Sequence, residues 1–258
     1  GMVAEVHRDY FNAGASIATT NRYAMHHDRF LGTPHEGRQS ELIELALAEA
    51  DAARTNHGSG RIAGSIGPLI WSYKPEVHPD YETATALYAE VANILGPRVD
   101  LILCETVASV DHARAVLDGA RTTNRPVWLS VTVDDENGSL LRSGEPVADL
   151  ADLKPDAWLA NCSAPEAMAD ALDVFADWGR PFGAYANGFE EITKAFLNPM
   201  SSVDELSARR DMGPEAYAKF ALGWIEQGAT IVGGCCEIGP AHISRIAGEI
   251  TRAGHEIV

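Results

Sequence analysis

Three of the four cysteines follow predicted strands. Cys162 comes directly after the apolar segment 157–161, and Cys235 and Cys236 follow segment 230–232 through a pair of glycines. In a parallel α/β fold the carboxyl ends of the strands meet at one edge, where ligands bind. Thiolates suit Zn²⁺, and three of them leave the fourth tetrahedral position for water or substrate. The spacing therefore predicts a catalytic zinc site made of Cys162, Cys235 and Cys236.

Structural and redox roles are the alternatives for these cysteines. Cys104 lies inside the apolar segment 101–105 with no second thiol nearby in sequence, so we expect an ordinary buried cysteine there. A redox couple between Cys235 and Cys236 is disfavoured because redox motifs usually place two residues between their thiols. Four cysteines in 258 residues are also too few for a disulfide scaffold. Reduced thiols with a chemical role are the better interpretation.

Helical segments alternate with short apolar segments rich in β-branched residues, which is the pattern of an α/β fold. The predicted helices cover 2–13, 39–56, 81–95, 110–121, 147–153, 165–178, 214–227 and 241–252. The seven predicted strands cover 15–20, 61–66, 101–105, 127–133, 157–161, 181–185 and 230–232. Two architectures fit this order: a (β/α)8 TIM-type barrel that lacks its first strand, and a doubly wound open sheet. The length favours the barrel.

The composition excludes several kinds of partner. The sequence has 20 Lys and Arg against 37 Asp and Glu, a formal net charge of −17, so we expect no nucleic acid and no anionic membrane as partner. No apolar run approaches the roughly 18 residues of a membrane span, and no leader is evident at the start. A single cytoplasmic domain over 1–258 is the simplest expectation, since no linker divides the chain. The long polar segment 186–212 is expected to be a functional loop.

Several short motifs together resemble the homocysteine S-methyltransferase family. In chain order they are DYFNAGASIATTNRY at 9–23, GSIGP at 64–68, ET at 105–106, VTVDDENG at 131–138, NCSAPEA at 161–167, YANG at 185–188 and IVGGCCEIGPAHI at 231–243. They occur in the family's order and cover essentially the whole chain. The resemblance implies a β/α barrel, the first of the two architectures above.

The resemblance also implies roles for individual residues. In the family, zinc is held by the cysteine after the sixth strand and the vicinal pair after the eighth, which correspond to Cys162, Cys235 and Cys236. Glu105 is implied to meet the amino group of the substrate, although a strand-end glutamate is equally suited to an ion pair. The residues implied to bind substrate are Glu105, Thr106, Asn21, Tyr23 and Asn187.

The sequence departs from the family pattern at two places. Members ordinarily begin with a strand that ends in a glycine-rich loop, whereas this sequence opens at the helix that should follow. Unpaired strand edges would result, and natural proteins cover such edges, so we expect a homo-oligomer or a local rearrangement. Glu237, directly after the cysteine pair, adds a negative charge that is expected to weaken acceptance of an amino-acid carboxylate.

The predicted activity is zinc-dependent transfer of a methyl group from a small onium donor, such as S-methylmethionine, to the thiol of homocysteine, which gives methionine. Betaine is a second possible donor, and 258 residues leave no room for a cobalamin or folate domain. Aromatic faces often hold onium groups, and Trp71, Tyr73 and Tyr23 lie in loops expected at the site. The alternative is an inactive relative that binds zinc or an amino acid without turnover, because the first strand is missing.

Overall fold

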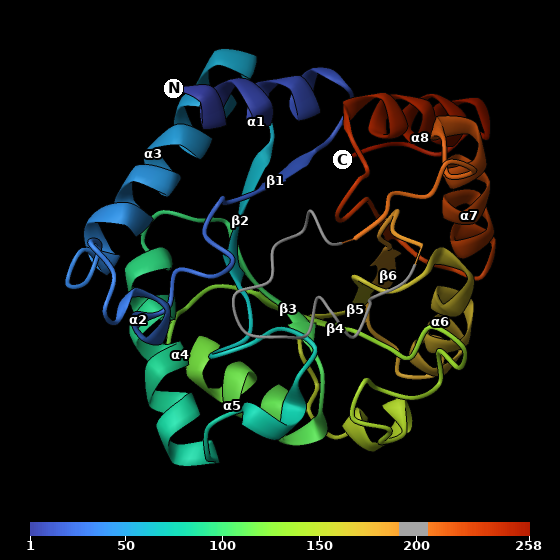
Figure 1. Cartoon of the computed structure of the whole chain (residues 1–258). Coiled ribbons are helices and arrows are strands. Elements are labelled where there is room, and N and C mark those ends of the chain that lie inside the picture. Colours follow the sequence, from blue (N-terminus) through green and yellow to red (C-terminus); the bar gives the residue numbers. More distant parts are fainter. Residues whose placement is uncertain (191–205) are drawn as a thin grey trace.

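A computed structural model describes residues 1–190 and 206–258, and its strands form one curled parallel sheet (Figure 1). The strand order follows the chain, from β1 to β7, and each neighbouring pair is parallel. The strands are β1 Ile17–Thr19, β2 Arg61–Ile66, β3 Leu101–Val107, β4 Val127–Val131, β5 Ala157–Asn161, β6 Phe182–Tyr185 and β7 Ile231–Val232. All their carboxyl ends therefore lie at the same edge of the sheet.

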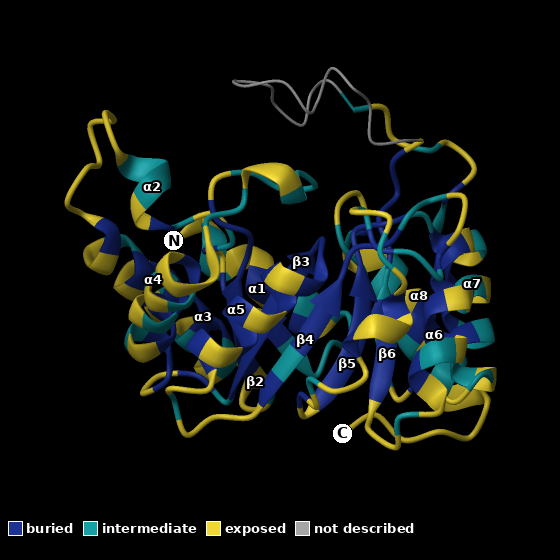
Figure 2. Cartoon of the chain, turned by 90° about the horizontal axis from the view of Figure 1, so that it is seen from below, coloured by how far each residue is buried: buried dark blue, intermediate teal, exposed yellow. Residues whose placement is uncertain are grey.

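The helices surround the convex side of this sheet (Figure 1). The α-helices are α1 Met2–Asn12, α2 His27–Phe30, α3 Gln39–His57, α4 Tyr81–Leu95, α5 Val110–Ala120, α6 Met168–Ala176, α7 Pro214–Glu226 and α8 Pro240–Arg252. Short 3₁₀ helices cover Pro75–Val77, Val147–Leu150 and Pro165–Ala167. Figure 2 shows the strands buried between the exposed outer faces of the helices.

Alternate residues of each strand face two different cores, because side chains alternate across a strand. Ile102 and Cys104 of β3 belong to the large apolar cluster that the helices cover, whereas Leu101 and Leu103 join Ala63 and Leu159 in a smaller cluster on the concave side. All seven residues of β3 are buried. Burial on both faces is typical of parallel sheets with helical crossovers.

The two edge strands are not joined to each other. Among the described strands, β1 pairs only with β2, and β7 pairs only with β6. The outer layer nevertheless meets across this opening, where the Tyr10 hydroxyl of α1 donates to the Ile238 carbonyl just before α8 (2.8 Å). The structure is thus a seven-stranded curled half-barrel, which confirms the barrel interpretation with seven strands. A doubly wound sheet would carry helices on both faces.

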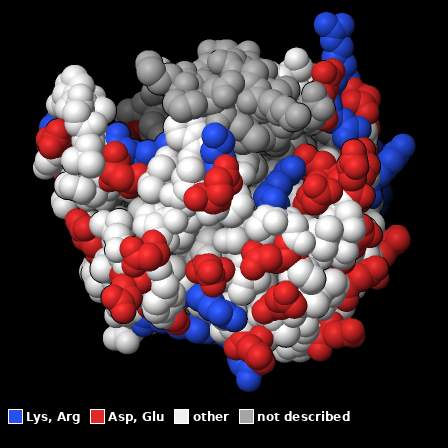
Figure 3. Space-filling model, turned by 60° about the horizontal axis from the view of Figure 1, so that its bottom comes forward, with Lys and Arg blue, Asp and Glu red and all other residues white. Residues whose placement is uncertain are grey.

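Most predicted elements are present, with local differences. The segment predicted as one helix over 165–178 forms a 3₁₀ turn followed by α6, and the segment predicted over 147–153 forms only a 3₁₀ turn. The predicted loop 186–212 is described only in part, since residues 191–205 lie outside the described residues. Acidic side chains are scattered over the face drawn in Figure 3, as the net charge of −17 leads one to expect. None of the described helices is long and apolar enough to cross a membrane.

Candidate metal centre

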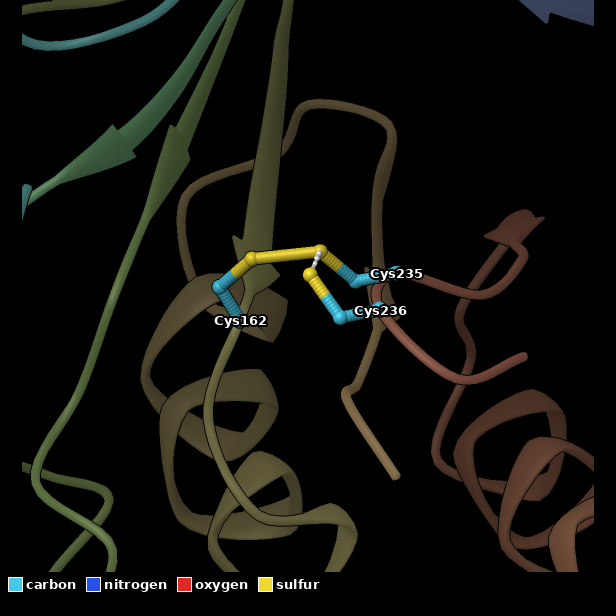
Figure 4. A group of neighbouring side chains, drawn as sticks. All are labelled: Cys162, Cys235 and Cys236. Carbon is cyan, nitrogen blue, oxygen red and sulfur yellow. Dashed lines mark hydrogen bonds between the residues drawn. A yellow bond between two sulfur atoms is a disulfide. The ribbon is translucent and has the colours of Figure 1, made fainter. Parts of the chain in front are cut away.

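The thiols of Cys162, Cys235 and Cys236 lie together at the carboxyl edge of the sheet (Figure 4). Their three Sγ atoms lie within 4.8 Å of one another, and the Sγ atoms of Cys235 and Cys236 are 3.9 Å apart. The structure joins Cys162 to Cys235 as a disulfide, with their Cα atoms 5.9 Å apart. Cys162 is buried and Cys236 is exposed, so the cluster lies between the core and solvent.

The backbone at the end of β5 directs Cys162 toward this cluster. Cys162 has φ 51°, in the left-handed region that a non-glycine residue seldom adopts. Its amide donates to the Tyr185 carbonyl (3.4 Å), and its own carbonyl accepts from the Thr132 hydroxyl (3.3 Å). Hydrogen bonds from both neighbouring strands thus hold the strained backbone of Cys162 in place. Strained residues of this kind are common at functional sites.

The cysteine pair lies on a loop that is fixed to the loop after β6. The Cys235 amide donates to the Ala186 carbonyl (2.9 Å), and the Gly188 amide donates to the Cys236 carbonyl (2.9 Å). Gly234 is required in this turn, because a Cβ there would overlap the side chain of Ile238. Both thiols of the pair are therefore carried on a braced turn.

The arrangement of the three thiols fits a single metal ion. With metal–sulfur bonds of about 2.3 Å, sulfurs around a tetrahedral ion lie roughly 3.8 Å apart. The 3.9 Å between Cys235 and Cys236 matches this separation, and Cys162 lies within 4.8 Å of both. Because a disulfide cannot ligate as two thiolates, Cys162 and Cys235 must be reduced before all three sulfurs can bind one ion. A soft, three-sulfur donor set suits Zn²⁺.

Glu105 lies on a β-bulge of β3, next to the same edge. The register of β3 against β4 shifts between Cys104 and Val107, which places Glu105 and Thr106 on the bulge. The Glu105 carboxylate is buried and accepts hydrogen bonds from the Ser65 hydroxyl and from the Tyr185 hydroxyl (3.1 Å). Burial raises the pKa of Glu105, and these two donors act against the rise.

Thr106, the second residue on the bulge, is tied to the residue before Cys162. The Thr106 amide donates to Asn161 Oδ1 (2.9 Å), and Asn161 Nδ2 donates to Thr106 Oγ1 (3.0 Å). Asn161 Oδ1 also accepts from the Ser130 hydroxyl (2.8 Å). Thr106 has φ 60°, so it is a second non-glycine residue in the left-handed region. The buried side-chain amide of Asn161 holds it there through these two hydrogen bonds. Thr106 is therefore held by the scaffold around Cys162.

The other predicted substrate residues differ in their surroundings. Asn187 is buried, and its backbone amide donates to the Ser163 carbonyl (3.1 Å) beside the cysteine cluster. Tyr23 shares a hydrogen bond with Ser72 Oγ (2.8 Å). Burial raises the pKa of Tyr23, and the nearby charge of Glu105 raises it further, so these two groups lie close enough to interact. Asn21 is exposed, and no hydrogen bond joins its side chain to another described residue.

Two of the aromatic rings expected near the site already contact cations of the protein. The Arg29 guanidinium lies over the Trp71 ring, 5.3 Å from the ring centroid, and the Arg142 guanidinium lies over the Tyr73 ring, at 5.6 Å. Each of these rings therefore has one face occupied. Tyr23 is the remaining ring of the three.

Sequence reasoning missed the groups that surround Glu105. Ser65 lies near the end of β2 and belongs to the motif GSIGP. Tyr185 lies at the end of β6 and belongs to the motif YANG. Arg22, in the loop after β1, is fully buried and contacts the Ser65 carbonyl. Their position at strand ends is the signal that could have found them, because strand ends of a parallel sheet converge on one edge. Position at a strand end does not, however, predict which of these side chains contact one another.

A parallel β/α half-barrel with a thiol cluster at the carboxyl edge is the class of protein that this fold and site define. Residues 1–250 match the family model described as homocysteine S-methyltransferase, and the chain belongs to that family. The members of the family are methyltransferases that act on homocysteine, and this chain is accordingly a methyltransferase.

Relatives with assigned names match most of this chain. It is 26% identical to homocysteine S-methyltransferase YbgG of Bacillus subtilis, over 95% of this chain and 82% of that protein. The homocysteine S-methyltransferase of Escherichia coli is also 26% identical, over 95% of this chain and 83% of its own. Methionine synthase of Mycobacterium leprae is 27% identical over 97% of this chain, which is 21% of that enzyme.

Solved structures of one relative share the fold. The homocysteine methyltransferase MmuM of Escherichia coli superposes in its metallated form with a TM-score of 0.78 at 24% identity, over 95% of this chain and 83% of that one. Its oxidized form superposes with a TM-score of 0.79 at 23% identity, over 96% of this chain and 84% of that one. The same fold has therefore been solved in that relative both with metal and oxidized.

Proposed function

We propose that this protein transfers a methyl group from a small onium donor, such as S-methylmethionine, to the thiol of homocysteine in a zinc-dependent reaction that gives methionine. The observation that carries the proposal is the cluster of Cys162, Cys235 and Cys236, whose Sγ atoms lie within 4.8 Å of one another. Zinc held by these residues would supply a centre at which the substrate sulfur is bound as a thiolate. The names of the relatives above support the choice of acceptor.

The roles proposed for the other residues follow from their charge and position. Glu105 would accept the ammonium group of the bound amino acid, since it is a buried carboxylate at the same edge as the thiols. Tyr185, through its hydrogen bond to Glu105, would keep the carboxylate in one orientation. Asn187 and Tyr23 would form the walls of the substrate pocket. Exposed Asn21 would contact the substrate only at its outer end.

Positioning of the substrates is expected to contribute more than ionisation of the thiol. A free thiol with a pKa near 8.5 is about 3% ionised near neutral pH, so complete ionisation contributes at most about 2 kcal/mol. Holding two reactants in line contributes roughly 7–11 kcal/mol. The residues that fix the amino acid, Glu105 above all, are therefore expected to matter as much as the three cysteines.

The charge of the site favours a cationic donor. Three thiolates around a divalent ion carry a net charge of −1, and Glu105 and Glu237 add carboxylates at the same edge. Such a site attracts an onium group that comes close to it. Because Arg29 and Arg142 occupy faces of Trp71 and Tyr73, the onium group is expected to pack on Tyr23.

Methyl transfer to homocysteine is the direct test. Reduced, zinc-loaded protein is incubated with homocysteine and either S-methylmethionine or betaine, and methionine is quantified by mass spectrometry. We expect methionine from S-methylmethionine, loss of activity in Cys236→Ser, and activity in the matched variant Cys104→Ala, which removes a buried thiol outside the cluster. Bound zinc with no methionine from either donor would instead support the inactive relative.

A further inference from the structure

Arg22 is a fully buried cation beside the end of β1. Its side chain is about 1% exposed. Nη1 donates to the Ser65 carbonyl (2.5 Å) and Nη2 to the Met25 carbonyl (3.1 Å), while Nε has no hydrogen-bond partner among the described residues. Within residues 1–190 and 206–258, no carboxylate oxygen lies within 4.0 Å of this guanidinium. A buried charge without a paired counter-charge is costly, so its presence calls for an explanation.

The guanidinium remains charged despite its burial. Burial lowers the pKa of Arg22 to about 9, and the negative charge of Glu105 acts against this decrease. A pKa near that value keeps the guanidinium protonated around neutral pH. Arg22 and Glu105 therefore influence each other without direct contact.

Ser65 is the fixed link between these two charges. Its amide donates to Thr20 Oγ1 (3.0 Å), its carbonyl accepts from Arg22, and its hydroxyl donates to a carboxylate oxygen of Glu105. All three polar groups of Ser65 are thus in use. The serine cannot turn away from Glu105 without breaking this network, so the spacing between the cation and the carboxylate is set by the scaffold.

We propose that Arg22 is a positioning residue whose charge, held one residue away across Ser65, keeps the buried Glu105 carboxylate ionised, so that the site selects a thiol substrate with a free ammonium group. The inference rests on the proposed function and deepens it. An ionised carboxylate attracts an ammonium group, whereas a protonated carboxyl group offers only a neutral hydrogen bond. Arg22 would thereby control substrate choice without touching the substrate.

The other groups around Glu105 do not supply a positive charge. Tyr23 from the loop after β1, Cys104 from β3 itself, Tyr185 from β6 and Cys236 from the loop after β7 are neutral or negative. The thiol cluster with a divalent ion carries a net negative charge as well. Burial raises the pKa of Glu105 and so favours its protonated form, and of the cations in the described part of the chain only Arg22 acts against this rise.

Infrared difference spectroscopy tests the charge state of Glu105 directly. The spectrum of each protein is compared with that of its Glu105→Gln counterpart near neutral pH, because a protonated carboxyl group has a carbonyl stretching band that a carboxylate lacks. We expect no such band in the parent protein or in Arg22→Lys, and a clear band in Arg22→Met. Arg125→Met is the matched control, since the Arg125 guanidinium also donates to a backbone carbonyl (Gly96, 2.7 Å) but at the other edge of the sheet.

Homocysteine binding to the reduced, zinc-loaded protein provides the second measurement. Calorimetry on Arg22→Met is expected to show affinity about tenfold weaker near neutral pH, with recovery as the pH rises and Glu105 ionises. The affinity of 3-mercaptopropionate, which carries the thiol but no ammonium group, should not change. Arg22→Lys should bind homocysteine like the parent protein.

Two outcomes would overturn the inference. One is a protonated Glu105 in the parent protein, which needs no variant to fold. The other is an Arg22→Met protein whose Glu105 band and homocysteine affinity match the parent. The infrared result is independent of catalysis: a band that depends on Arg22 in a protein that forms no methionine would uphold the inference and reject only the proposed function.

Discussion

The Tyr217 hydroxyl of α7 donates a hydrogen bond to the carbonyl of Gly233 (2.8 Å), two residues before the cysteine pair. The same hydroxyl accepts from the Ala186 amide (2.9 Å), at the start of the loop that pairs with Cys235. The buried Tyr217 hydroxyl thus joins two loops: the loop after β7, which carries Cys235 and Cys236, and the loop after β6, which hydrogen-bonds to it. Groups that support metal ligands in this way tune metal affinity.

Tyr217→Phe is expected to loosen the proposed zinc site without removing any of its three cysteines. The Gly233 carbonyl and the Ala186 amide lose their shared partner, which is expected to weaken zinc affinity about 10–100-fold. Competition with a chromophoric chelator measures that affinity. Phe220→Leu, on the same helix, removes no hydrogen-bonding group and is the control. Unchanged affinity in Tyr217→Phe would show that the brace has no effect on the ligands.

Asn161→Ala is expected to destabilise the folded protein. It leaves the buried Thr106 amide and Ser130 hydroxyl without their shared acceptor, at a cost of about 1–3 kcal/mol in the free energy of unfolding. Asn93→Ala, which removes an exposed amide side chain from α4, is expected to change it by less than about 0.5 kcal/mol. Urea denaturation measures both changes. Equal effects of the two substitutions would contradict the stabilising role of the Asn161 side chain as a shared acceptor.

Metal uptake is expected to require reduction. With Cys162 and Cys235 joined, the oxidised chain offers two free thiols, Cys104 and Cys236, and only Cys236 belongs to the cluster. Thiol titration of the denatured protein should therefore rise from two to four on reduction. Zinc retained after gel filtration should increase in parallel. Full zinc binding by the oxidised protein would mean that another ligand set holds the metal.

The unpaired edges of the sheet predict self-association. β1 and β7 each lack a partner on one side among the described strands, and exposed strand edges of this kind favour pairing with another chain. Ile17 of β1 and Ile231 of β7 are also only half-buried. Sedimentation equilibrium should show a dimer or higher oligomer, and a monomer at all accessible concentrations would reject this expectation.

The strand rhythm and the cysteine spacing could be predicted from the sequence because both depend on local pattern. Segments 61–66 and 157–161 match β2 and β5 residue for residue, since apolar runs bounded by turn residues define buried strands. Helix α2 could not be predicted: it spans only four residues and buries none of them.

Contacts between residues distant in sequence could not be predicted from local pattern. The Ser163 hydroxyl, for example, hydrogen-bonds the backbone amide and carbonyl of Val133 after β4, thirty residues away in sequence. The Arg22–Ser65–Glu105 network joins the loop after β1 to β2 and to the bulge of β3, and a left-handed turn at Cys162 follows β5. Neither backbone feature has a sequence signature such as glycine, so only the folded chain reveals them.

Metal analysis of the reduced protein tests the central claim most directly. Inductively coupled plasma mass spectrometry after zinc loading and gel filtration should give about one zinc per chain for the parent protein and for Cys104→Ala. Cys162→Ser, Cys235→Ser and Cys236→Ser should each retain far less. A parent protein that holds no zinc after full reduction, or triple loss of these thiols with no loss of zinc, would contradict a three-cysteine metal centre.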